Sequence, residues 1–308
     1  MGSAVLLQQV INGLSLGAMY ALLAIGFTLV YGILELINFA HFNVFMIGSF
    51  FGMWALEGLG LSGQSQALSG LALFGALGVA FAAAMLGSGL LGVAIERIAL
   101  RPLRGISGTT GMITTIGVSY ILFNVILLGA GADAKNFPNP LPTRQWQVAG
   151  ATIDLREVLI WGIAFVLMVS LQLFVSRTRL GKAMRATAQD SEAARMMGVD
   201  VDRVIVAAFF LGSALAGAAA LIFGLYYNYT SFLIGYTAGL RAFTAAVLGG
   251  IGSITGAMVG GLIIGLIETL GGQLIAVRWT DVIIFSILVL VLVFVPSGLF
   301  GRAAPTKA

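Results

Sequence analysis

The chain has 308 residues, of which 59% are hydrophobic and only 9% are charged, and its mean hydropathy is +1.03. A soluble domain carries about 25% charged residues, so this composition excludes a soluble enzyme and predicts an integral membrane protein. The sequence has no cysteine, which excludes disulfides and thiolate sites, and because His41 is its single histidine we expect no metal site. The net charge of +4 fits the basic loops of a membrane protein rather than a nucleic-acid partner.

Long apolar runs predict an all-α bundle of about eight or nine transmembrane helices, because a helical span needs about 20 apolar residues. A ninth run, Ala242–Leu248, is too short to cross alone and predicts a broken or re-entrant segment. No boundary divides the chain, so we expect one permease domain over residues 1–308, beginning with a retained helix rather than a signal peptide. The eight longer runs are Leu6–Val30, Ala40–Leu56, Leu71–Ile95, Met112–Ala130, Val158–Val175, Val204–Tyr227, Ala257–Val277 and Val282–Val295.

The distribution of Lys and Arg predicts the orientation of the chain in the membrane. The positive-inside rule places the more basic set of loops in the cytoplasm, so the amino terminus lies outside and the carboxyl terminus inside. This requires an odd number of crossings, which is nine if the short segment crosses. The basic set, 11 of the 16 basic residues, consists of Arg97, Arg101, Arg104, Arg177, Arg179, Lys182, Arg185, Arg195, Arg203, Arg302 and Lys307. The opposite set consists of Lys135, Arg144, Arg156, Arg241 and Arg278.

Two polar loops stand out. The external loop, residues 131–157, contains Pro138, Pro140 and Pro142 and is interpreted as an ordered cap or a docking surface. The internal loop, residues 177–203, carries six of the 16 basic residues and contains signals for a short helix.

In the internal loop Asp190 is a good N-cap, because its carboxylate can accept hydrogen bonds from free backbone N–H groups of the first turn. Glu192 lies near the positive end of the helix, and Gly198 can supply the left-handed C-cap. The residues between them predict a small apolar knob suited to a groove in another protein. An amphipathic helix on the membrane surface and binding of anionic lipid are the alternatives. The apolar residues are Ala193, Ala194, Met196 and Met197.

The run from Glu192 to Gly198, Glu-Ala-Ala-x-x-x-Gly, resembles the EAA loop of ABC importer permeases, whose coupling helix sits in a cleft of the ATPase subunit. The apolar-Leu-Pro tail of that loop is absent, since Ala208–Leu211 contains no proline, and this points away from the maltose-type branch. The runs Arg185-Ala-x-Ala-Gln-Asp190 and Met197-Gly-Val-Asp-Val-Asp-Arg203 are instead similar to the branched-chain amino-acid permeases.

Further runs, in order, extend this resemblance over nearly the whole chain and specify the H-type permease subunit of that family. They are Gly17–Leu22, Gly26–Gly32, Ile37–His41, Glu96-Arg97 with Arg101–Arg104, Thr114–Ser119 and Phe243–Ser253.

The resemblance implies half of the translocation pathway of an ATP-driven importer in a bacterial or archaeal cytoplasmic (inner) membrane. It implies as partners a second related permease subunit, two cytoplasmic ABC ATPase subunits, an external or periplasmic substrate-binding protein, and membrane lipid. The expected cargo is leucine, isoleucine or valine; urea, short amides or other neutral amino acids are the alternatives. The residues expected to couple to the ATPase are Asp190, Glu192, Ala193, Ala194, Met197 and Gly198.

No nucleotide site is expected on the chain itself. A P-loop needs Gly-x-x-x-x-Gly-Lys followed by Ser or Thr, and here Gly181-Lys182 is followed by Ala183. We therefore expect no cofactor on this chain and ATP and Mg use by separate ATPases. Gly252, Gly256 and Gly260 recur every four residues, which predicts a face for close helix contact, as do the pairs Gly13/Gly17 and Gly48/Gly52.

Polar residues inside predicted spans are candidates for the translocation path, because a charge at mid-bilayer costs about 2.5–3.5 kcal/mol by insertion scales and needs a partner or a wet lining. Each candidate also has a structural alternative. Glu268 could be a clamp between helices, and Arg241 could snorkel to the headgroups instead of attracting a substrate carboxylate. The threonines, like Asn124, could form hydrogen bonds between helices. The candidates are Asn38, His41, Thr114, Thr115, Arg241 and Glu268.

Four polar residues follow Val30, where Gly32 is expected to break the helix and expose backbone groups. Asn38 and His41, three residues apart, would share one helix face. We expect the group to line the path, to pack inside the bundle or to lie at the cytoplasmic surface. The four are Glu35, Asn38, His41 and Asn43.

Two other classes of function remain open at this point. An ion- or proton-coupled secondary carrier could use Glu268 or Glu35 as its coupling group. A membrane-embedded enzyme has no support, because no nucleophile and base occur together in a recognisable pattern.

Overall fold

The structure is a computed structural model that describes residues 2–62, 67–104 and 108–301. Arg302, Lys307 and the carboxyl terminus, to which the orientation prediction refers, lie outside the described residues. The α-helices are α1 (Ser3–Leu34), α2 (Ala40–Gly58), α3 (Gly70–Ile95), α4 (Gly108–Ala130), α5 (Leu155–Arg177), α6 (Arg179–Gln189), α7 (Ser191–Met196), α8 (Val201–Tyr227), α9 (Ile234–Gly249), α10 (Ile254–Leu274) and α11 (Thr280–Phe294).

Shorter elements connect these helices. A π-helical turn η1 (Glu96–Leu100) and a 3-10 turn η2 (Arg101–Leu103) extend α3, and a 3-10 turn η3 (Val277–Trp279) precedes α11. Strands β2 (Gln145–Val148) and β3 (Ala151–Asp154) form an antiparallel hairpin, and β1 (Lys135–Asn136) pairs with β4 (Tyr229–Thr230). The predicted external loop is therefore ordered around two short sheets.

The expectation of an all-α membrane protein is confirmed. In the described part of the chain, seven helices are long and apolar enough to cross a membrane. Helices α2 and α9 complete the bundle but fall outside that count: α9 has 16 residues, and α2 carries polar residues such as His41 and Asn43. The predicted run Ala257–Val277 extends too far, because α10 ends at Leu274 and Val277 already belongs to the turn η3.

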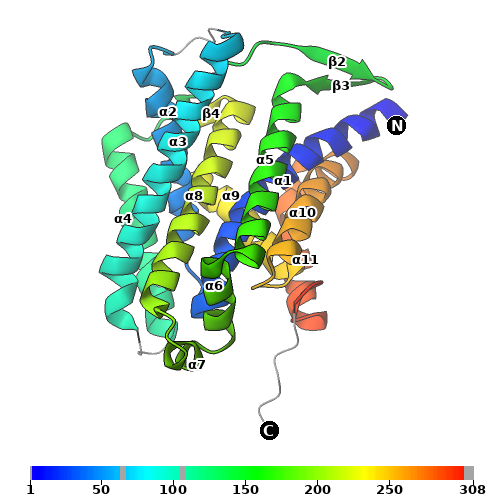
Figure 1. Ribbon diagram of the computed structural model, residues 1–308. Coiled ribbons are helices and arrows are strands. Elements are labelled where there is room, and N and C mark those ends of the chain that lie inside the picture. Colours follow the sequence, from blue (N-terminus) through cyan, green and yellow to red (C-terminus); the bar gives the residue numbers. More distant parts are fainter. Residues whose placement is uncertain (1, 63–66, 105–107, 302–308) are drawn as a thin grey trace.

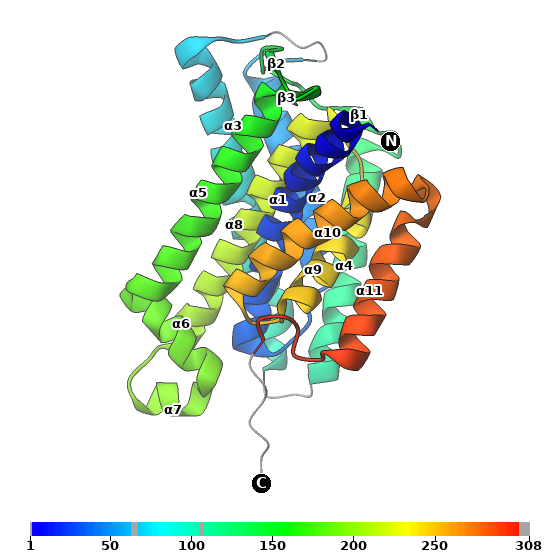
Figure 2. The same cartoon turned by 90° about the vertical axis from the view of Figure 1, so that its right-hand side faces the viewer.

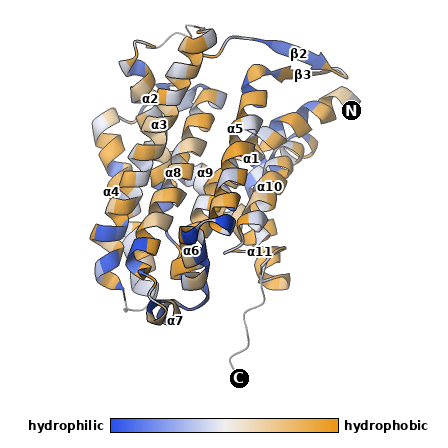
Figure 3. Ribbon diagram, in the orientation of Figure 1, coloured by the Kyte–Doolittle hydropathy of each residue, from blue (hydrophilic) through white to orange (hydrophobic). Residues whose placement is uncertain are grey.

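The bundle has two polar ends, which we call the hairpin end and the α7 end. Figure 1 places the β2–β3 hairpin and the amino terminus at one end, and α6 and α7 at the other. Hydrophilic residues gather at these two ends, whereas apolar residues cover the helices between them (Figure 3). This distribution is the one that a bilayer of about 30 Å hydrocarbon thickness imposes.

Helices α1 and α8 lie at the centre of the bundle. In their most apolar stretches, 83% and 78% of the residues are buried, against 17% in α4 and 11% in α11. The outer helices expose large apolar side chains such as Leu71, Leu128 and Phe165. An apolar surface of this extent suits lipid rather than water.

Close backbone contacts hold α10 against α1. Figure 2 shows the two helices side by side, with α11 on the far side of α10 from α5. A Cβ added at Gly261 would meet the backbone of Ala21, and one added at Gly265 would meet the backbone of Gly17. Small residues here allow helix axes to approach, as the spacing of Gly13 and Gly17 predicted.

The predicted glycine face on α10 is correct in part. Gly256 packs against Gly249, and Gly260 packs against the Ala245 carbonyl, so α9 and α10 are in close contact. Gly252 does not join that face: it lies in the turn before α10, with φ +94° and open space around its α-carbon. Only glycine adopts that φ readily, so its role is in the turn.

The pair Gly48/Gly52 also lies at a helix contact, as predicted. A Cβ at Gly48 would meet Gly217, and one at Gly52 would meet the side chain of Leu221. Both partners belong to the central helix α8, so small residues of α2 allow that helix to approach it.

The predicted short segment is a broken crossing. Helix α9 is longer than Ala242–Leu248 but still shorter than a full span. Before it, Thr230 is buried and its hydroxyl lies 2.5 Å from that of Ser49 on α2. The segment begins at β4, which pairs with β1 near the hairpin end. It ends at Gly249, whose carbonyl accepts a hydrogen bond from the Phe300 N–H near the far end of α1.

The break between α1 and α2 occurs later than predicted. Gly32 lies within α1, which continues to Leu34, and the chain turns at Glu35 with φ +50°. Asn38 precedes α2, so it does not share a helix face with His41. The prediction failed because a single glycine leaves the backbone hydrogen bonds of a buried helix intact.

Candidate functional site

Helix α7 forms as the local sequence predicts. Asp190 is its N-cap, and the Asp190 Oδ1 atom accepts from the N–H groups of Glu192 and Ala193, both at 2.9 Å. Gly198 follows the helix with φ +84°, and its N–H donates to the Arg195 carbonyl at 2.9 Å. The cap and the glycine define a helix of six residues at the far end of the bundle.

Two exposed methionines lie at the end of α7, beside polar residues. Met196 and Met197 are 82% and 84% exposed, whereas Ala194 is 5% exposed and packs into the chain's own core. The exposed surface of this segment is therefore made by the two methionines together with Ser191, Glu192 and Arg195. Two flexible, polarizable side chains at a protruding helix end suit an irregular groove.

Helix α6 connects α7 to the bundle. Thr178 caps α6 by accepting from the Gly181 N–H at 3.0 Å, and Gly181 packs against the carbonyls of Phe174 and Val175 at the end of α5. The Arg185 guanidinium donates to that same Val175 carbonyl. The α5–α6 junction is thus held by hydrogen bonds and close backbone packing.

One carboxylate joins α7 to two transmembrane helices. Asp202, in the first turn of α8, pairs with Arg195 of α7 at 3.7 Å and with Arg101 of η2 at 3.1 Å. It also accepts from Arg104 at 2.5 Å, and Arg104 pairs in turn with Glu96. Glu96 is fully buried at the end of α3. Ion pairs therefore connect α7 with the start of α8 and the end of α3.

Sequence reasoning did not assign this arginine–carboxylate cluster, although it noted the arginines as basic loop residues. The signal was present in Arg101-Pro-Leu-Arg104 and in Asp200-Val-Asp202, but these runs are about 100 residues apart. Only the packing of α3 against α8 brings them together. Sequence spacing alone cannot pair charges across such a distance.

The first pair of path candidates lies where α1 meets α2. Asn38 Oδ1 accepts from the Ala40 N–H at 3.1 Å and so helps to begin α2. His41 is buried between Gly26 and the ring of Phe27, facing the Leu23 carbonyl. Both side chains are enclosed by protein, an arrangement that serves packing.

The threonine candidates form hydrogen bonds within and between helices. The Thr115 hydroxyl accepts from the Phe39 N–H at 3.2 Å and faces the Met112 carbonyl at 2.8 Å, tying α4 to the start of α2. Thr114 donates to the Thr110 carbonyl at 2.9 Å within α4. Asn43 adds a second bond between α2 and α4 by donating to the Ser119 carbonyl at 2.8 Å.

The charged candidates Arg241 and Glu268 lie together. Arg241 of α9 pairs with Glu268 of α10 at 2.6 Å and with Asp281 of α11 at 2.8 Å. It also donates to the Tyr20 hydroxyl of α1 at 3.2 Å. One guanidinium thus joins four helices, so Arg241 does not simply snorkel to the headgroups. Asp281 and Tyr20 are members that the sequence did not single out.

No metal site is evident in the structure. Among residues 2–62, 67–104 and 108–301, no three or more His, Asp or Glu side chains lie together so that they could hold an ion. Glu268 is instead paired with Arg241.

Comparison with known proteins agrees with this architecture. The High-affinity branched-chain amino acid transport system permease protein BraD of Pseudomonas aeruginosa is 42% identical over 306 residues, covering 98% of this chain and 97% of BraD. The corresponding LivH proteins of Salmonella typhimurium and Escherichia coli K12 are 41% and 40% identical, each again covering 98% of this chain and 97% of the relative.

A family model extends the same match. Residues 9–292, from the second turn of α1 to the end of α11, match the family described as the permease component of the branched-chain amino acid transport system. The match includes the α6–α7 region, the cluster around Asp202 and the four-helix contact at Arg241. The chain belongs to the branched-chain amino acid transport permease family.

Proposed function

We propose that this chain is one of two related permease subunits of an ATP-driven importer for branched-chain amino acids. Its α7 end lies in the cytoplasm, the hairpin end outside, and the carboxyl terminus inside. The observation that carries the proposal is the capped helix α7, which presents Met196 and Met197 beyond the membrane helices and is bonded to α8 through Asp202. The basic character of this end supports the orientation.

In this mechanism two cytoplasmic ATPases bind ATP and Mg, and they contact helix α7 of the permease subunits. ATP-driven closure of the ATPases displaces α7. The cluster around Asp202 transmits that displacement to α8 and α3, and the braced α5–α6 junction carries α5 along. The result is a rigid-body switch between inward-open and outward-open states.

The hairpin end receives the substrate from an external binding protein. The β2–β3 hairpin, the β1–β4 pair and the capping box that joins Asp154 to Glu157 give this end an ordered surface. Leucine, isoleucine and valine are the proposed cargo, because relatives about 40% identical over nearly their full length carry that name.

An ion-coupled carrier is less well supported. Its coupling group would have to bind and release a proton or an ion during the cycle, and Glu268 is held by the Arg241 guanidinium at 2.6 Å. Such a cycle would have to break this ion pair repeatedly and leave the buried carboxylate without its partner. Glu35 lies in the turn after α1, at the α7 end.

The coupling assignment is tested by changing the exposed methionines together. In the double variant Met196→Glu/Met197→Glu the chain is expected to insert normally but to lose ATPase association, because two charges cannot enter an apolar groove without desolvation. The measurement is co-purification of the ATPase subunits with the permease pair from membranes. The control is Met196→Leu/Met197→Leu, which keeps the apolar surface. Equal recovery of ATPase with both double variants would remove α7 from the interface.

The cargo assignment is tested with the assembled transporter in proteoliposomes containing ATP and supplied with its external binding protein. Labelled leucine, isoleucine and valine are expected to accumulate, and labelled urea is not. Accumulation of urea with exclusion of leucine would replace the proposed cargo by the amide alternative.

A further inference from the structure

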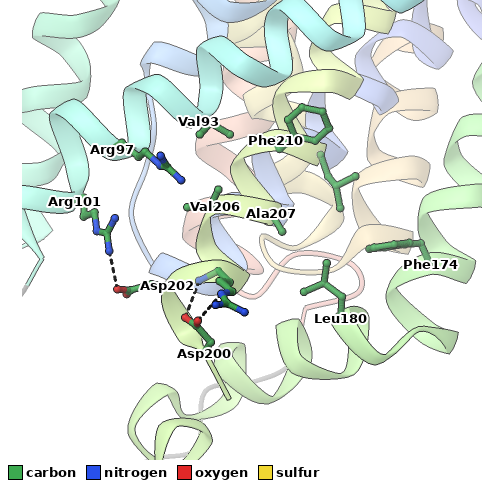
Figure 4. Close-up of a pocket in the computed structure, with 12 residues that line it drawn as sticks. Val93, Arg97, Arg101, Phe174, Leu180, Asp200, Asp202, Val206, Ala207 and Phe210 are labelled. Atoms are coloured by element: carbon green, nitrogen blue, oxygen red, sulfur yellow. Dashed lines mark hydrogen bonds and ion pairs between the residues drawn. The ribbon is translucent and has the colours of Figure 1, made fainter. Parts of the chain in front are cut away.

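A cavity of about 580 Å³ opens at the α7 end, between the end of α3, the α5–α6 junction and the start of α8. Its inner surface is apolar and includes Val93, Phe174 and Phe210. Figure 4 shows Arg97 and Arg101 on the α3 side of this space, Leu180 and Phe174 on the opposite side, and Phe210 deeper in. The cavity thus has a cationic rim and an apolar interior.

The rim of the cavity carries more positive than negative side chains. Arg101 pairs with Asp202 at 3.1 Å, and Arg203 pairs with Asp200 at 2.8 Å. Asp202 is shared with two further arginines. Arg97, by contrast, makes no ion pair with any residue that the structure describes. The rim can therefore accept an anion without breaking an existing pair.

The helices that border the cavity also carry exposed apolar residues, which suit acyl chains. On α3 the exposed residues leading toward it include Leu86 and Leu90, and on α5 they include Val169 and Leu173. Figure 1 shows α8 lying between α3 and α5 along this side. Helices with lipid-facing apolar residues thus border a cavity whose rim carries three arginines and two aspartates.

We propose that this cavity binds an anionic phospholipid of the inner leaflet. The phosphate lies against Arg97 at the rim, beside Arg101 and Arg203, and an acyl chain lies over Phe210. The proposal rests on the orientation given above, which places this rim at the level of the cytoplasmic headgroups. Basic residues near that surface attract anionic lipid, and apolar walls distinguish a lipid from a free anion.

The bound lipid would contact the moving parts. The rim residues Arg101 and Arg203 belong to the segments that the Asp202 cluster joins, and Leu180 belongs to α6. A lipid held there fills the space between α3 and α6. Its headgroup therefore adds one more connection between the coupling region and the transmembrane helices.

The test is native mass spectrometry of the assembled transporter, titrated in detergent with phosphatidylglycerol or with phosphatidylcholine of the same acyl chains. Phosphatidylglycerol is expected to bind more tightly. Arg97→Gln should weaken that binding roughly fivefold, the contribution of one basic residue near an anionic surface. The matched control is Arg177→Gln, which removes the same charge outside the cavity. A second variant, Ala207→Leu, reduces the apolar space and should weaken binding of both lipids without changing charge.

Two results would overturn the proposal: equal affinity for the two lipids, or equal effects of the Arg97 and Arg177 substitutions. Competition by free glycerol 1-phosphate as effective as that by the lipid would assign the rim to soluble phosphates instead. A crosslink from position 207 to the second permease subunit would show that protein covers the cavity. Because the readout is lipid binding, its failure would leave the importer assignment intact. Failure of the ATPase subunits to co-purify would instead contradict the importer assignment, and the two outcomes are therefore distinguishable.

Discussion

The contact around Arg241 shows how a membrane bundle accommodates a charge that its sequence places within the bilayer. The guanidinium lies between carboxylates of α10 and α11 and the phenol of α1. Leaving one member of such a cluster alone is costly, because a buried charge without a partner keeps its desolvation penalty. This arrangement favours a clamp between helices over direct contact with the substrate.

A pair of substitutions separates these two roles. Arg241→Met leaves Glu268 unpaired and should lower the free energy of unfolding by about 3 kcal/mol, whereas Arg241→Met/Glu268→Met should recover much of that loss. Thermal unfolding of the purified chain in detergent measures both. If the cluster is a clamp, the double variant also keeps uptake. A stable double variant without uptake would instead place the charges on the pathway.

The residue Glu268 can be examined alone as well. Glu268→Gln keeps the shape of the side chain and its capacity to accept from Arg241, while Asp281 still balances the guanidinium. We expect leucine uptake within about twofold of the parent, because a neutral amide can still accept a hydrogen bond from Arg241 and the guanidinium keeps a second carboxylate as its partner. Abolished uptake with normal insertion and stability would show that the charge itself is required.

At the scale of elements, helix α7 depends for its stability on its contacts with the bundle rather than on its own length. Its six residues could not form a stable helix in isolation, since isolated helices shorter than about 12 residues are marginal in water. The Asp190 cap, the buried Ala194 and the pair between Arg195 and Asp202 fix it to the bundle. A firmly attached knob can transmit force, which a loose one cannot.

Neutralising Asp202 should therefore separate ATP hydrolysis from transport. In Asp202→Asn the ATPases should still associate, but uptake per ATP should fall by roughly two- to thirtyfold, the range expected when coupling changes by about 0.5–2 kcal/mol. Simultaneous assays of phosphate release and leucine uptake in proteoliposomes measure this ratio. The control is Asp200→Asn, which removes a neighbouring charge whose described ion pair is only to Arg203. The same ratio in both variants would contradict a transmitting role for Asp202.

The contact between α1 and α10 gives a second prediction for elements. Gly261→Ala places a methyl group against the backbone of Ala21 and should destabilise the chain by about 1–3 kcal/mol. Gly117→Ala on α4 meets nothing within 4 Å and should be neutral or stabilising by up to about 1 kcal/mol. Thermal unfolding of the two variants in one detergent compares them. Equal stability would mean that the helices are not in backbone contact.

The sequence predicts elements well where the signal is local. Each predicted span overlaps a helix of the structure, because apolar runs are bounded by polar residues, and Asp190 and Gly198 mark α7 through their own backbone chemistry. Helix α9 was underestimated because Tyr236, Thr237 and Arg241 interrupt its apolar pattern. The packing of α1, α10 and α11 around Arg241 provides the partners that allow such residues inside a bundle.

The sequence does not predict which distant groups meet. Both ion-pair clusters join helices whose order in space is set by glycine contacts and side-chain packing over the whole bundle. The break at Glu35 was likewise misplaced to Gly32, since burial of α1 outweighs the weak helix preference of one glycine. Asn38 thereby moved from a helix face to the turn before α2.

At the scale of the whole molecule, the two ends of the bundle have different roles. The hairpin end is ordered by small sheets and a capping box, whereas the α7 end has a protruding helix and a concentration of arginines. The family and the polarity of these ends together support one direction of insertion. Every step of the proposed cycle depends on α7 reaching the ATPases in the cytoplasm.

Cysteine labelling tests that direction most directly, because the natural sequence contains no cysteine. Met197→Cys and, as its opposite control, Gln147→Cys in the hairpin are each exposed to a membrane-impermeant maleimide in right-side-out and inside-out vesicles. The account predicts that position 197 reacts only in inside-out vesicles and becomes protected when the ATPases are present, while position 147 reacts only in right-side-out vesicles. Labelling of position 197 in right-side-out vesicles would contradict it.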